Sequence, residues 1–353
     1  MKIMFSDATL LHGGAERVIS ILANELVKMG HEVEIFLMYD KPIWYELDSK
    51  IKVYNDEEAI GKTNIIRHII YRHTVFKKTD AEVIISFLAP VNMINIVSSF
   101  FCETRMIVAD RNDPRFVPSN AIVRKVRDFL YRFANGVVVQ NTDNKKYFSR
   151  AVQKKSTVIF NPIDLGEKRG QALRTEKKKR IVSVGRLIKQ KNQIMLLEAF
   201  AEIHKDYPEY TLTIYGEGDY RDILEAKIKE TGLEGFADLP GSKKDVFDLI
   251  SDAELFVLPS DYEGMPNVLI EAMCLGLPVI STAVSGTSDL VEDGVNGRIV
   301  EVGNKEQLEK AMRELLSDES TRNEYAQKAV LVNDRLEVSG IMAQWQKFIE
   351  DVR

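Results

Sequence analysis

Cysteine is scarce in this chain, whose 353 residues include only Cys102 and Cys274, far apart in the sequence. Two isolated cysteines exclude a disulfide-rich scaffold, and we expect both to be core thiols in a reducing compartment. No Asp-x-Asp triplet occurs, and the five histidines show no metal-ligand spacing: His12, His31, His68, His73 and His204. A divalent cation bridging protein and substrate needs clustered oxygen ligands, so we expect no metal requirement.

Long apolar runs are also lacking. The residues after Lys2 are apolar only as far as Phe5, which is far too short for the core of a secretory leader. Residues 83–101 carry no charge over 19 positions, close to the length of a membrane span, but Pro90 and several Asn and Ser interrupt them. We interpret this stretch as a buried strand, a turn and a packed helix, with a re-entrant or interfacial segment as the alternative. A cytoplasmic protein is expected.

Charge is unevenly divided along the chain, although its overall composition is that of a globular protein. Hydrophobic residues make up 45% and charged residues 29%, with a net charge of −5, and the length predicts about two domains. Residues 1–170 hold 25 Lys and Arg against 20 Asp and Glu, whereas residues 171–353 hold 23 against 33. This division argues against a nucleic-acid partner and allows the first half to face an anionic surface.

Apolar strands alternate with amphipathic helices throughout, which predicts an α/β protein with parallel sheets covered on both faces. We expect strands at residues 2–5, 32–38, 83–88, 180–184, 210–215, 254–258 and 278–281. We expect helices at residues 15–28, 193–204, 222–231, 246–251 and 267–274. Ligands bind at the carboxyl ends of the strands in sheets of this kind.

The series of strands and helices restarts after a polar, glycine-containing stretch at residues 165–179, which has the composition of a linker. We therefore expect two doubly wound, Rossmann-like domains, residues 1–163 and 164–340, facing each other across a cleft. The last helix, about residues 341–353, carries Trp345 and other apolar residues on one face, and we expect it to pack back on the first domain.

The strongest motif runs from Ser260 to Glu271, between a predicted strand and a predicted helix. Pro266 suits the first helical turn, where free backbone N–H groups and the helix dipole favour an anion. Glu263 and Glu271 place two carboxylates beside that anion site, an arrangement that suits a ligand with both phosphates and hydroxyls. The alternative is that Glu263 caps the helix and Glu271 is solvated.

Two further loops follow predicted strands. Gly185-Arg186 and Lys191-Asn192 bring Arg186 and Lys191 to one sheet edge, where a guanidinium and an ammonium form a typical diphosphate-binding pair. Gly13 and Gly14, between the first strand and the first helix, allow a close backbone approach to a ligand. Neither this loop nor Gly216-Glu217-Gly218 has the G-x-G-x-x-G spacing of dinucleotide-binding proteins, and a tight turn is the alternative for both.

These elements, in this order, resemble the retaining glycosyltransferases of family 4, which have the GT-B architecture, and the resemblance covers essentially the whole chain. It implies that Arg186 and Lys191 hold the diphosphate of a UDP-sugar donor and that Glu271 holds its ribose. It further implies that Glu263 faces the transferred sugar, as does the backbone of Gly264, Met265, Pro266 and Asn267. Gly13 and Gly14 would lie across the cleft by the phosphates, and residues 241–243 would contact the base.

One segment departs from that family. Many relatives have a histidine after the strand that ends near residue 109, where this chain has Asp110-Arg111-Asn112-Asp113-Pro114. Asp110 or Arg111 is a candidate for contact with the reacting sugars, and Asp110 is included among the candidate catalytic residues with Glu263, Arg186 and Lys191. A structural turn is the alternative.

The basic residues of the first half concentrate in two stretches. Residues 62–78 contain Lys62, Arg67, Arg72, Lys77 and Lys78. Residues 111–132 contain Arg111, Arg115, Arg124, Lys125, Arg127 and Arg132. Each basic residue near an anionic membrane adds about 1 kcal/mol, so we predict peripheral contact of the first domain with the inner leaflet. A solvated helix face is the alternative.

The resemblance implies a retaining hexosyltransferase that uses a UDP-sugar and no metal or other cofactor. Its acceptor would be a glycan or a polyprenyl-diphosphate-linked sugar in the assembly of surface polysaccharide or glycoprotein glycans. Two alternatives stay open at this point: a sugar-nucleotide epimerase of the same architecture, and a non-catalytic sugar-nucleotide-binding protein.

Overall fold

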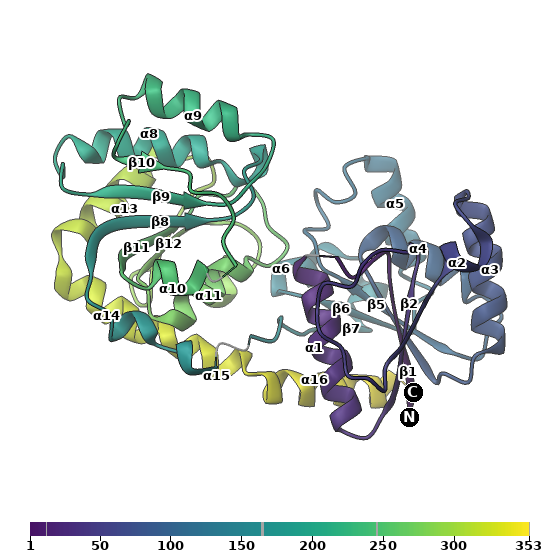
Figure 1. Cartoon of the computed structure of the whole chain (residues 1–353). Coiled ribbons are helices and arrows are strands. Elements are labelled where there is room, and N and C mark those ends of the chain that lie inside the picture. The colour runs from purple at the N-terminus through teal and green to yellow at the C-terminus, as the bar shows by residue number, and fades with distance from the viewer. Residues whose placement is uncertain (12, 164–165, 245, 353) are drawn as a thin grey trace. The chain divides into compact units, whose positions relative to one another are not determined.

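The computed structural model describes residues 1–11, 13–163, 166–244 and 246–352, and strands and helices alternate along them (Figure 1). The chain forms two compact units: unit 1 is Met1–Pro162 with Val338–Arg353, and unit 2 is Ile163–Glu337. The sequence analysis placed these bounds at residues 163/164 and 340/341. His12, which precedes Gly13 and Gly14, and the first residues of the predicted second domain, Asp164 and Leu165, lie outside the described residues.

Unit 1 is built on a parallel sheet of seven strands, counted over the described residues, in the order β3-β2-β1-β4-β5-β6-β7. The strands are β1 (Lys2–Asp7), β2 (Glu32–Leu37), β3 (Lys52–Asn55), β4 (Val83–Phe87), β5 (Arg105–Asp110), β6 (Gly136–Val139) and β7 (Ser156–Val158). The helices are α1 (Gly14–Lys28), α2 (Asp56–Ile60), α3 (Ile65–Lys78), α4 (Ala89–Ser98), α5 (Ala121–Leu130), α6 (Thr142–Tyr147), α7 (Arg150–Gln153) and α16 (Val338–Val352).

The strands of unit 1 are buried on both faces, which explains their nearly continuous apolar sequences. In β1, Ile3 and Phe5 point into one core layer and Met4 into the other. The chain order reverses between β1 and β4, so the switch point of this sheet lies at the ends of those two strands.

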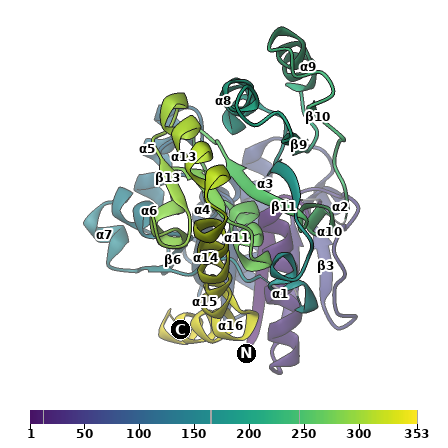
Figure 2. The same ribbon diagram turned by 90° about the vertical axis from the view of Figure 1, so that its left-hand side faces the viewer.

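Helix α16 packs on the first of these layers, beside α1 (Figure 2). Trp345 is 1% exposed and stacks on Phe87 of β4, with ring centroids 6.3 Å apart. A Cβ on Gly136, at the start of β6, would lie 2.8 Å from the ring of Phe348, so a glycine there allows the helix to approach the sheet closely. The last helix therefore belongs to the core of unit 1.

Unit 2 contains, in its described part, a parallel sheet of six strands in the order β10-β9-β8-β11-β12-β13. The strands are β8 (Lys178–Val184), β9 (Thr211–Tyr215), β10 (Ala237–Asp238), β11 (Ala253–Leu258), β12 (Val279–Thr282) and β13 (Arg298–Val300). Helices α8 (Gln193–His204), α9 (Arg221–Glu230) and α13 (Lys305–Ser317) cover one face (Figure 1). The remaining helices are α10 (Val246–Ile250), α11 (Asn267–Leu275), α12 (Thr287–Leu290), α14 (Glu319–Ala329) and α15 (Asn333–Leu336).

The structure differs from the sequence analysis in the segment before β8 and in elements that were not predicted. Residues 166–179 are part of unit 2 rather than a linker: the 3₁₀ turns Gly166–Lys168 and Gln171–Leu173 precede β8, Gly170 N donates to Cys274 O (2.9 Å), and Ala172 is fully buried. The short strands β3, β6, β7, β10 and β13 were not predicted, because two to four residues carry too little pattern. Several helices, among them α3, α5, α13 and α14, were not predicted either. The segment 83–101 does form a strand and a helix, and no helix in the described part of the chain is long and apolar enough to cross a bilayer.

Candidate functional site in unit 2

The first part of the site is the loop that follows β8. It runs from Gly185 through a 3₁₀ turn, Lys189–Lys191, to Asn192, which begins α8. Asn192 has a left-handed backbone (φ 46°), and its side chain accepts a hydrogen bond from Met195 N. Asparagine tolerates this conformation and caps helices, so its position explains the sharp turn after Lys191.

The loop after β9 packs directly against the loop after β8. Leu187 N donates to Glu217 O, and Gly185 N donates to Tyr215 O, both over 2.9 Å. A Cβ on Gly216 (φ +150°) would lie 1.9 Å from Gly185 O. The glycines at 216 and 218, interpreted from the sequence only as a tight turn, are required because one loop backbone lies directly against the other.

The third loop follows β11, the neighbour of β8 in the sheet, and carries Glu263. Lys191 Nζ lies 2.6 Å from Glu263 Oε1, and Ser260 Oγ donates to the same oxygen over 2.7 Å. The Lys191 and Glu263 side chains are only 14% and 9% exposed. Two residues 72 positions apart, each predicted to be in the site, thus form a partly buried ion pair.

Further hydrogen bonds tie the β8 and β11 loops together. Asn192 Nδ2 donates to Asp261 Oδ1 (2.7 Å), Asp261 N donates to Gln190 O (2.8 Å), and Gln190 Nε2 donates to Tyr262 O (2.7 Å). The sequence analysis gave no role to Ser260, Gln190 or Asp261. The Ser-x-x-Glu spacing of residues 260 and 263 was the one local signal, since side chains so spaced can meet across a turn.

Helix α11 begins directly after this loop. Met265 and Pro266 are buried, and Pro266 is the residue before the first helical one. Proline has no N–H, so the first turn of α11 has one fewer donor to satisfy. Glu271 is 6% exposed, which removes the solvated alternative for this carboxylate. Gly264 and Asn267 lie on either side of this start, at the same sheet edge as Lys191.

Arg186 differs from Lys191 in that its side chain is exposed. Its backbone carbonyl accepts a hydrogen bond from Gln193 Nε2 (3.0 Å), which fixes the chain direction between β8 and α8. The 241–243 loop adjoins the site from the side of β9, because Gly216 N donates to Gly241 O (3.1 Å). The two cations thus follow the same strand, one held by Glu263 and one reaching solvent.

The two glycines predicted to contact phosphates lie in unit 1, at the carboxyl end of β1. Helix α1 begins at Gly14, and Gly13 O accepts a hydrogen bond from Tyr45 OH (2.8 Å). Gly13 itself is extended (φ −167°), so a positive φ is not the reason for glycine there. A Cβ on Gly13 would lie 2.2 Å from Glu16 Oε2, the end of a flexible side chain.

Asp110 ends β5 and is 1% exposed. Its carboxylate accepts hydrogen bonds from Tyr131 OH (3.0 Å) and Asn112 N (3.3 Å), and burial raises its pKa. Arg111 lies against the rings of Phe87 and Trp345 and donates to Asn161 Oδ1 (2.9 Å), and burial lowers its pKa to about 9. Both side chains are part of the interior of unit 1, and a role for Asp110 in the reaction stays a prediction.

Three of the arginines that were predicted to form a basic surface on the first domain are buried. Arg72 and Arg127 are 0% exposed and Arg111 is 7% exposed, so these three of the basic residues named above do not reach solvent. Arg72 pairs with Asp56, and Arg127 donates to Pro114 O and Asp128. A buried guanidinium is paired or hydrogen-bonded, and sequence alone does not distinguish it from a surface one.

A metal ion would need several clustered ligands. The described residues contain no group of three or more His, Cys, Asp or Glu side chains placed to hold one. Both cysteines are free thiols, but only Cys274 is in the core: it is fully buried, and burial raises its pKa to about 12, whereas Cys102 is half-buried.

The comparisons with known proteins identify the family and the fold. The model of the family described as glycosyl transferases group 1 matches residues 165–331. The chain is 31% identical, over 100% of its length and 99% of the relative, to a Campylobacter jejuni enzyme named GalNAc-alpha-(1->4)-GalNAc-alpha-(1->3)-diNAcBac-PP-undecaprenol alpha-1,4-N-acetyl-D-galactosaminyltransferase. It is also 31% identical, over 90% of both chains, to another Campylobacter jejuni enzyme, an N-acetylgalactosamine-N,N'-diacetylbacillosaminyl-diphospho-undecaprenol 4-alpha-N-acetylgalactosaminyltransferase.

Solved structures share the fold across the whole chain. Anabaena Alr3699/HepE in complex with UDP aligns with a TM-score of 0.81 at 21% identity, covering 99% of this chain and 100% of that one. Sucrose-phosphate synthase from Thermosynechococcus elongatus aligns with a TM-score of 0.86 at 18% identity, covering 99% and 98%. The two parallel-sheet units are thus the two Rossmann-like domains of the GT-B fold, and the chain belongs to the group 1 glycosyltransferases.

Proposed function

We propose that this glycosyltransferase moves a hexose or N-acetylhexosamine from a UDP-sugar to a glycan or polyprenyl-diphosphate-linked acceptor, with retention of configuration. The names of the two Campylobacter relatives describe acceptors linked to undecaprenol through a diphosphate. Crystals of the structural relative HepE hold UDP and UDP-glucose. Assembly of surface polysaccharide or of glycoprotein glycans is the process that fits such substrates.

The Lys191–Glu263 pair carries this proposal. Its ammonium is 14% exposed and lies at the carboxyl edge of the sheet, next to the start of α11, which supports a role in neutralising a departing diphosphate. Arg186 adds a second, solvent-reaching cation after the same strand. Glu263, held by Ser260 and Lys191, presents a fixed carboxylate to the hydroxyls of the transferred sugar.

In the reaction that we infer, the bond between the sugar C1 and the oxygen of the β-phosphate breaks. The acceptor hydroxyl oxygen bonds to C1 from the same face, and its proton passes to the departing phosphate oxygen. The residues of this chain then act by orienting the donor, by neutralising the leaving group and by excluding water.

The direct test is a UDP-release screen with UDP-glucose, UDP-galactose, UDP-N-acetylglucosamine and UDP-N-acetylgalactosamine, using a bacterial lipid extract as the acceptor. We expect one donor to release UDP only when the extract is present, and Glu263→Ala to remove that release. Conversion of the donor into another sugar nucleotide without acceptor would indicate an epimerase. Donor binding without turnover would indicate a binding protein, and either result would contradict the proposal.

We further propose that the transfer needs no metal ion, because Lys191, Arg186 and the start of α11 supply the positive charge that a cation would otherwise provide. Treatment with EDTA, followed by gel filtration, is therefore expected to leave at least about half of the acceptor-dependent UDP release. Loss of transfer that Mg²⁺ or Mn²⁺ restores would show that this expectation is wrong.

We propose that unit 1 contacts an anionic membrane surface through α5. Four apolar residues at helical spacing, exposed by 47–72%, line the outer side of this helix and the turn after it: Ile122, Val126, Phe129 and Phe133. Lys125 and Arg132 are exposed beside them, and Phe101, 98% exposed, lies in a neighbouring loop. Apolar side chains with flanking cations are typical of helices that lie in the membrane interface.

Flotation with vesicles that contain phosphatidylglycerol tests this contact. We expect binding at low salt that is weakened by salt, and at least about tenfold weaker binding for the double variant Ile122→Ser/Phe129→Ser. Ile223→Ser is the matched control, because Ile223 is 46% exposed on α9 of unit 2. Absence of wild-type flotation at low salt, or equal flotation of all three proteins, would contradict the proposed surface.

A further inference from the structure

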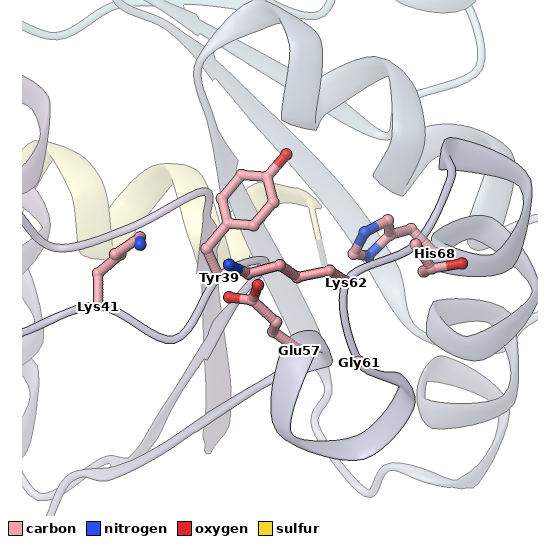
Figure 3. Close-up of a pocket in the computed structure, with 7 residues that line it drawn as sticks. Tyr39, Lys41, Glu57, Gly61, Lys62 and His68 are labelled. Carbon is pink, nitrogen blue, oxygen red and sulfur yellow. The ribbon is translucent and has the colours of Figure 1, made fainter.

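A pocket in unit 1 has no part in the site described above. It has a volume of about 400 Å³, within the range of small-molecule sites, and its side chains come from three segments (Figure 3). Tyr39 and Lys41 follow β2, Glu57 belongs to α2, and Lys62, Thr63 and His68 lie at or near the start of α3. We call it the β2–α3 pocket. It lies at the carboxyl edge of the sheet, the edge at which ligands bind in doubly wound folds.

The walls of the β2–α3 pocket are fixed by backbone hydrogen bonds. Tyr39 N donates to Ala8 O (3.0 Å), and Asp40 N donates to Glu57 Oε2 (3.0 Å), which joins the loop after β2 to α2. Gly61 ends α2 with a φ of +66°, and no heavy atom lies within 4 Å of a Cβ built there. The glycine therefore turns the chain sharply and leaves the pocket open at that point.

One of the residues that line the pocket is a buried histidine whose ring is hydrogen-bonded to a carboxylate. His68 is 4% exposed, its Nδ1 lies 2.7 Å from Asp56 Oδ2, and its ring meets Tyr39 edge to face at 6.2 Å. Asp56 in turn accepts from Arg72 Nε (2.6 Å), and Arg72 Nη1 donates to Ser6 Oγ and Asn95 Oδ1. Because the carboxylate accepts, Nδ1 carries the proton in the neutral ring, and Nε2 is an acceptor.

The lining mixes donors, acceptors and an aromatic ring. Figure 3 shows Lys62 extending across the pocket, with its amino group near the Glu57 carboxylate and the Tyr39 ring. Asp40 and Glu58 line an adjoining hollow with the same two lysines and Glu57, so carboxylates outnumber ammonium groups around the opening. The pocket lining itself has two lysines and one carboxylate, but a small anion would also meet Asp40 and Glu58 at the opening, and a cation would meet the lysines. A neutral polyhydroxylated ligand can use both kinds of group and place its C–H face on Tyr39.

The position of the pocket along the sheet edge favours a role in binding the acceptor. It opens at the ends of β2 and β3, whereas the switch point of the sheet lies between β1 and β4. Adjacent strands are about 4.8 Å apart, so the pocket lies about 7–12 Å to one side of the switch point. That separation corresponds to one or two sugar units along an oligosaccharide.

We infer that the β2–α3 pocket binds a sugar unit of the acceptor glycan other than the one that receives the transferred sugar. The inference rests on the proposed function, because it assumes that the acceptor carries a glycan. Tyr39 would support one face of the sugar ring, while Lys62, Glu57 and His68 would hydrogen-bond its hydroxyl or acetamido groups.

The test uses the full chain labelled with 3-fluorotyrosine, with the ¹⁹F resonance of Tyr39 assigned from Tyr39→Phe. The probes are the methyl α-glycosides of N-acetylgalactosamine, N-acetylglucosamine and glucose at up to about 100 mM, and inorganic pyrophosphate. We expect at least one glycoside to shift the Tyr39 resonance saturably, and Lys62→Ala to weaken its binding at least about tenfold. Lys77→Ala, on the exposed far end of α3, is the control and should bind as the wild type does.

Three outcomes would overturn the inference: no shift with any glycoside, a shift with pyrophosphate alone, or a glycoside shift that Lys62→Ala does not weaken. Binding of UDP, followed in the same sample by calorimetry, reports on the donor site of unit 2. Failure of UDP to bind would count against the proposed function whatever the Tyr39 resonance does, so the two failures can be told apart.

Discussion

Replacement of Lys191 by alanine is expected to lower acceptor-dependent UDP release by about 10²–10³-fold. Removal of one preorganised group that stabilises developing negative charge has an effect of this size in other enzymes. Here the loss has a second component, because Glu263 is only 7% exposed and would keep Ser260 as a partner but lose its counter-ion. Removing one partner of a buried ion pair leaves an uncompensated charge, which is strongly destabilising.

Lys189→Ala is the matched control, since Lys189 lies in the same 3₁₀ turn but is exposed. It should retain wild-type kcat/KM within about threefold. Initial rates at several UDP-sugar concentrations give kcat and KM separately for both variants. Equal effects of the two substitutions would indicate a general influence of charge, and a small effect of Lys191→Ala would refute the assignment of Lys191 to the leaving group.

Gly216→Ala is expected to disrupt the same site without removing any functional group. The new Cβ would lie 1.9 Å from Gly185 O, so the backbone that carries Arg186 and Lys191 must move. We expect the free energy of unfolding of unit 2 to fall by about 3 kcal/mol, and the affinity for UDP to fall at least about tenfold. Urea denaturation of the full chain and calorimetry with UDP measure the two effects.

Gly232→Ala separates the clash from the cost of the backbone conformation. Gly232 also has a positive φ (+70°), but no heavy atom lies within 4 Å of the place that a Cβ would take. Its substitution should cost about 1–2 kcal/mol, the strain of a left-handed residue, and leave UDP affinity unchanged. If both variants bind UDP as the wild type does, the contact between the two loops is not what positions the site.

Local patterns in the sequence predicted most of the central strands and part of the helices of both units, among them α1, α8, α9 and α11. Runs such as Ile3–Phe5 and Leu255–Leu258 are apolar because a parallel sheet buries both faces, and the helices show 3.6-residue spacing, so each of these elements is encoded within its own residues. The motifs at 185–192 and 260–271 follow strands, and parallel strands end at one edge, which is why the two could be assigned to one site. The catalytic and binding roles of their residues stay predictions.

Other features depended on contacts between distant parts of the chain. The sequence around Gly216 is that of an ordinary turn, and only the structure shows that Gly185 lies against it. Ser260 has a role in the site because its partner Glu263 is paired with Lys191. The buried histidine of the β2–α3 pocket likewise depends on Asp56 and Arg72. The contacts of Gly216 with Gly185, of Lys191 with Glu263 and of Asp56 with His68 join residues from different elements, and no spacing along the chain encodes them.

For this protein, then, the sequence by itself determined the α/β class, the family resemblance and the segments that carry the candidate donor site. Only the tertiary structure decided which charges are inside: Arg72, Arg111 and Arg127 belong to the interior of unit 1, while Arg186 reaches solvent. The physical reason is that the free energy of a charged side chain depends on how deeply it is buried and on its hydrogen-bond and ion-pair partners. The fold brings those partners from other parts of the chain.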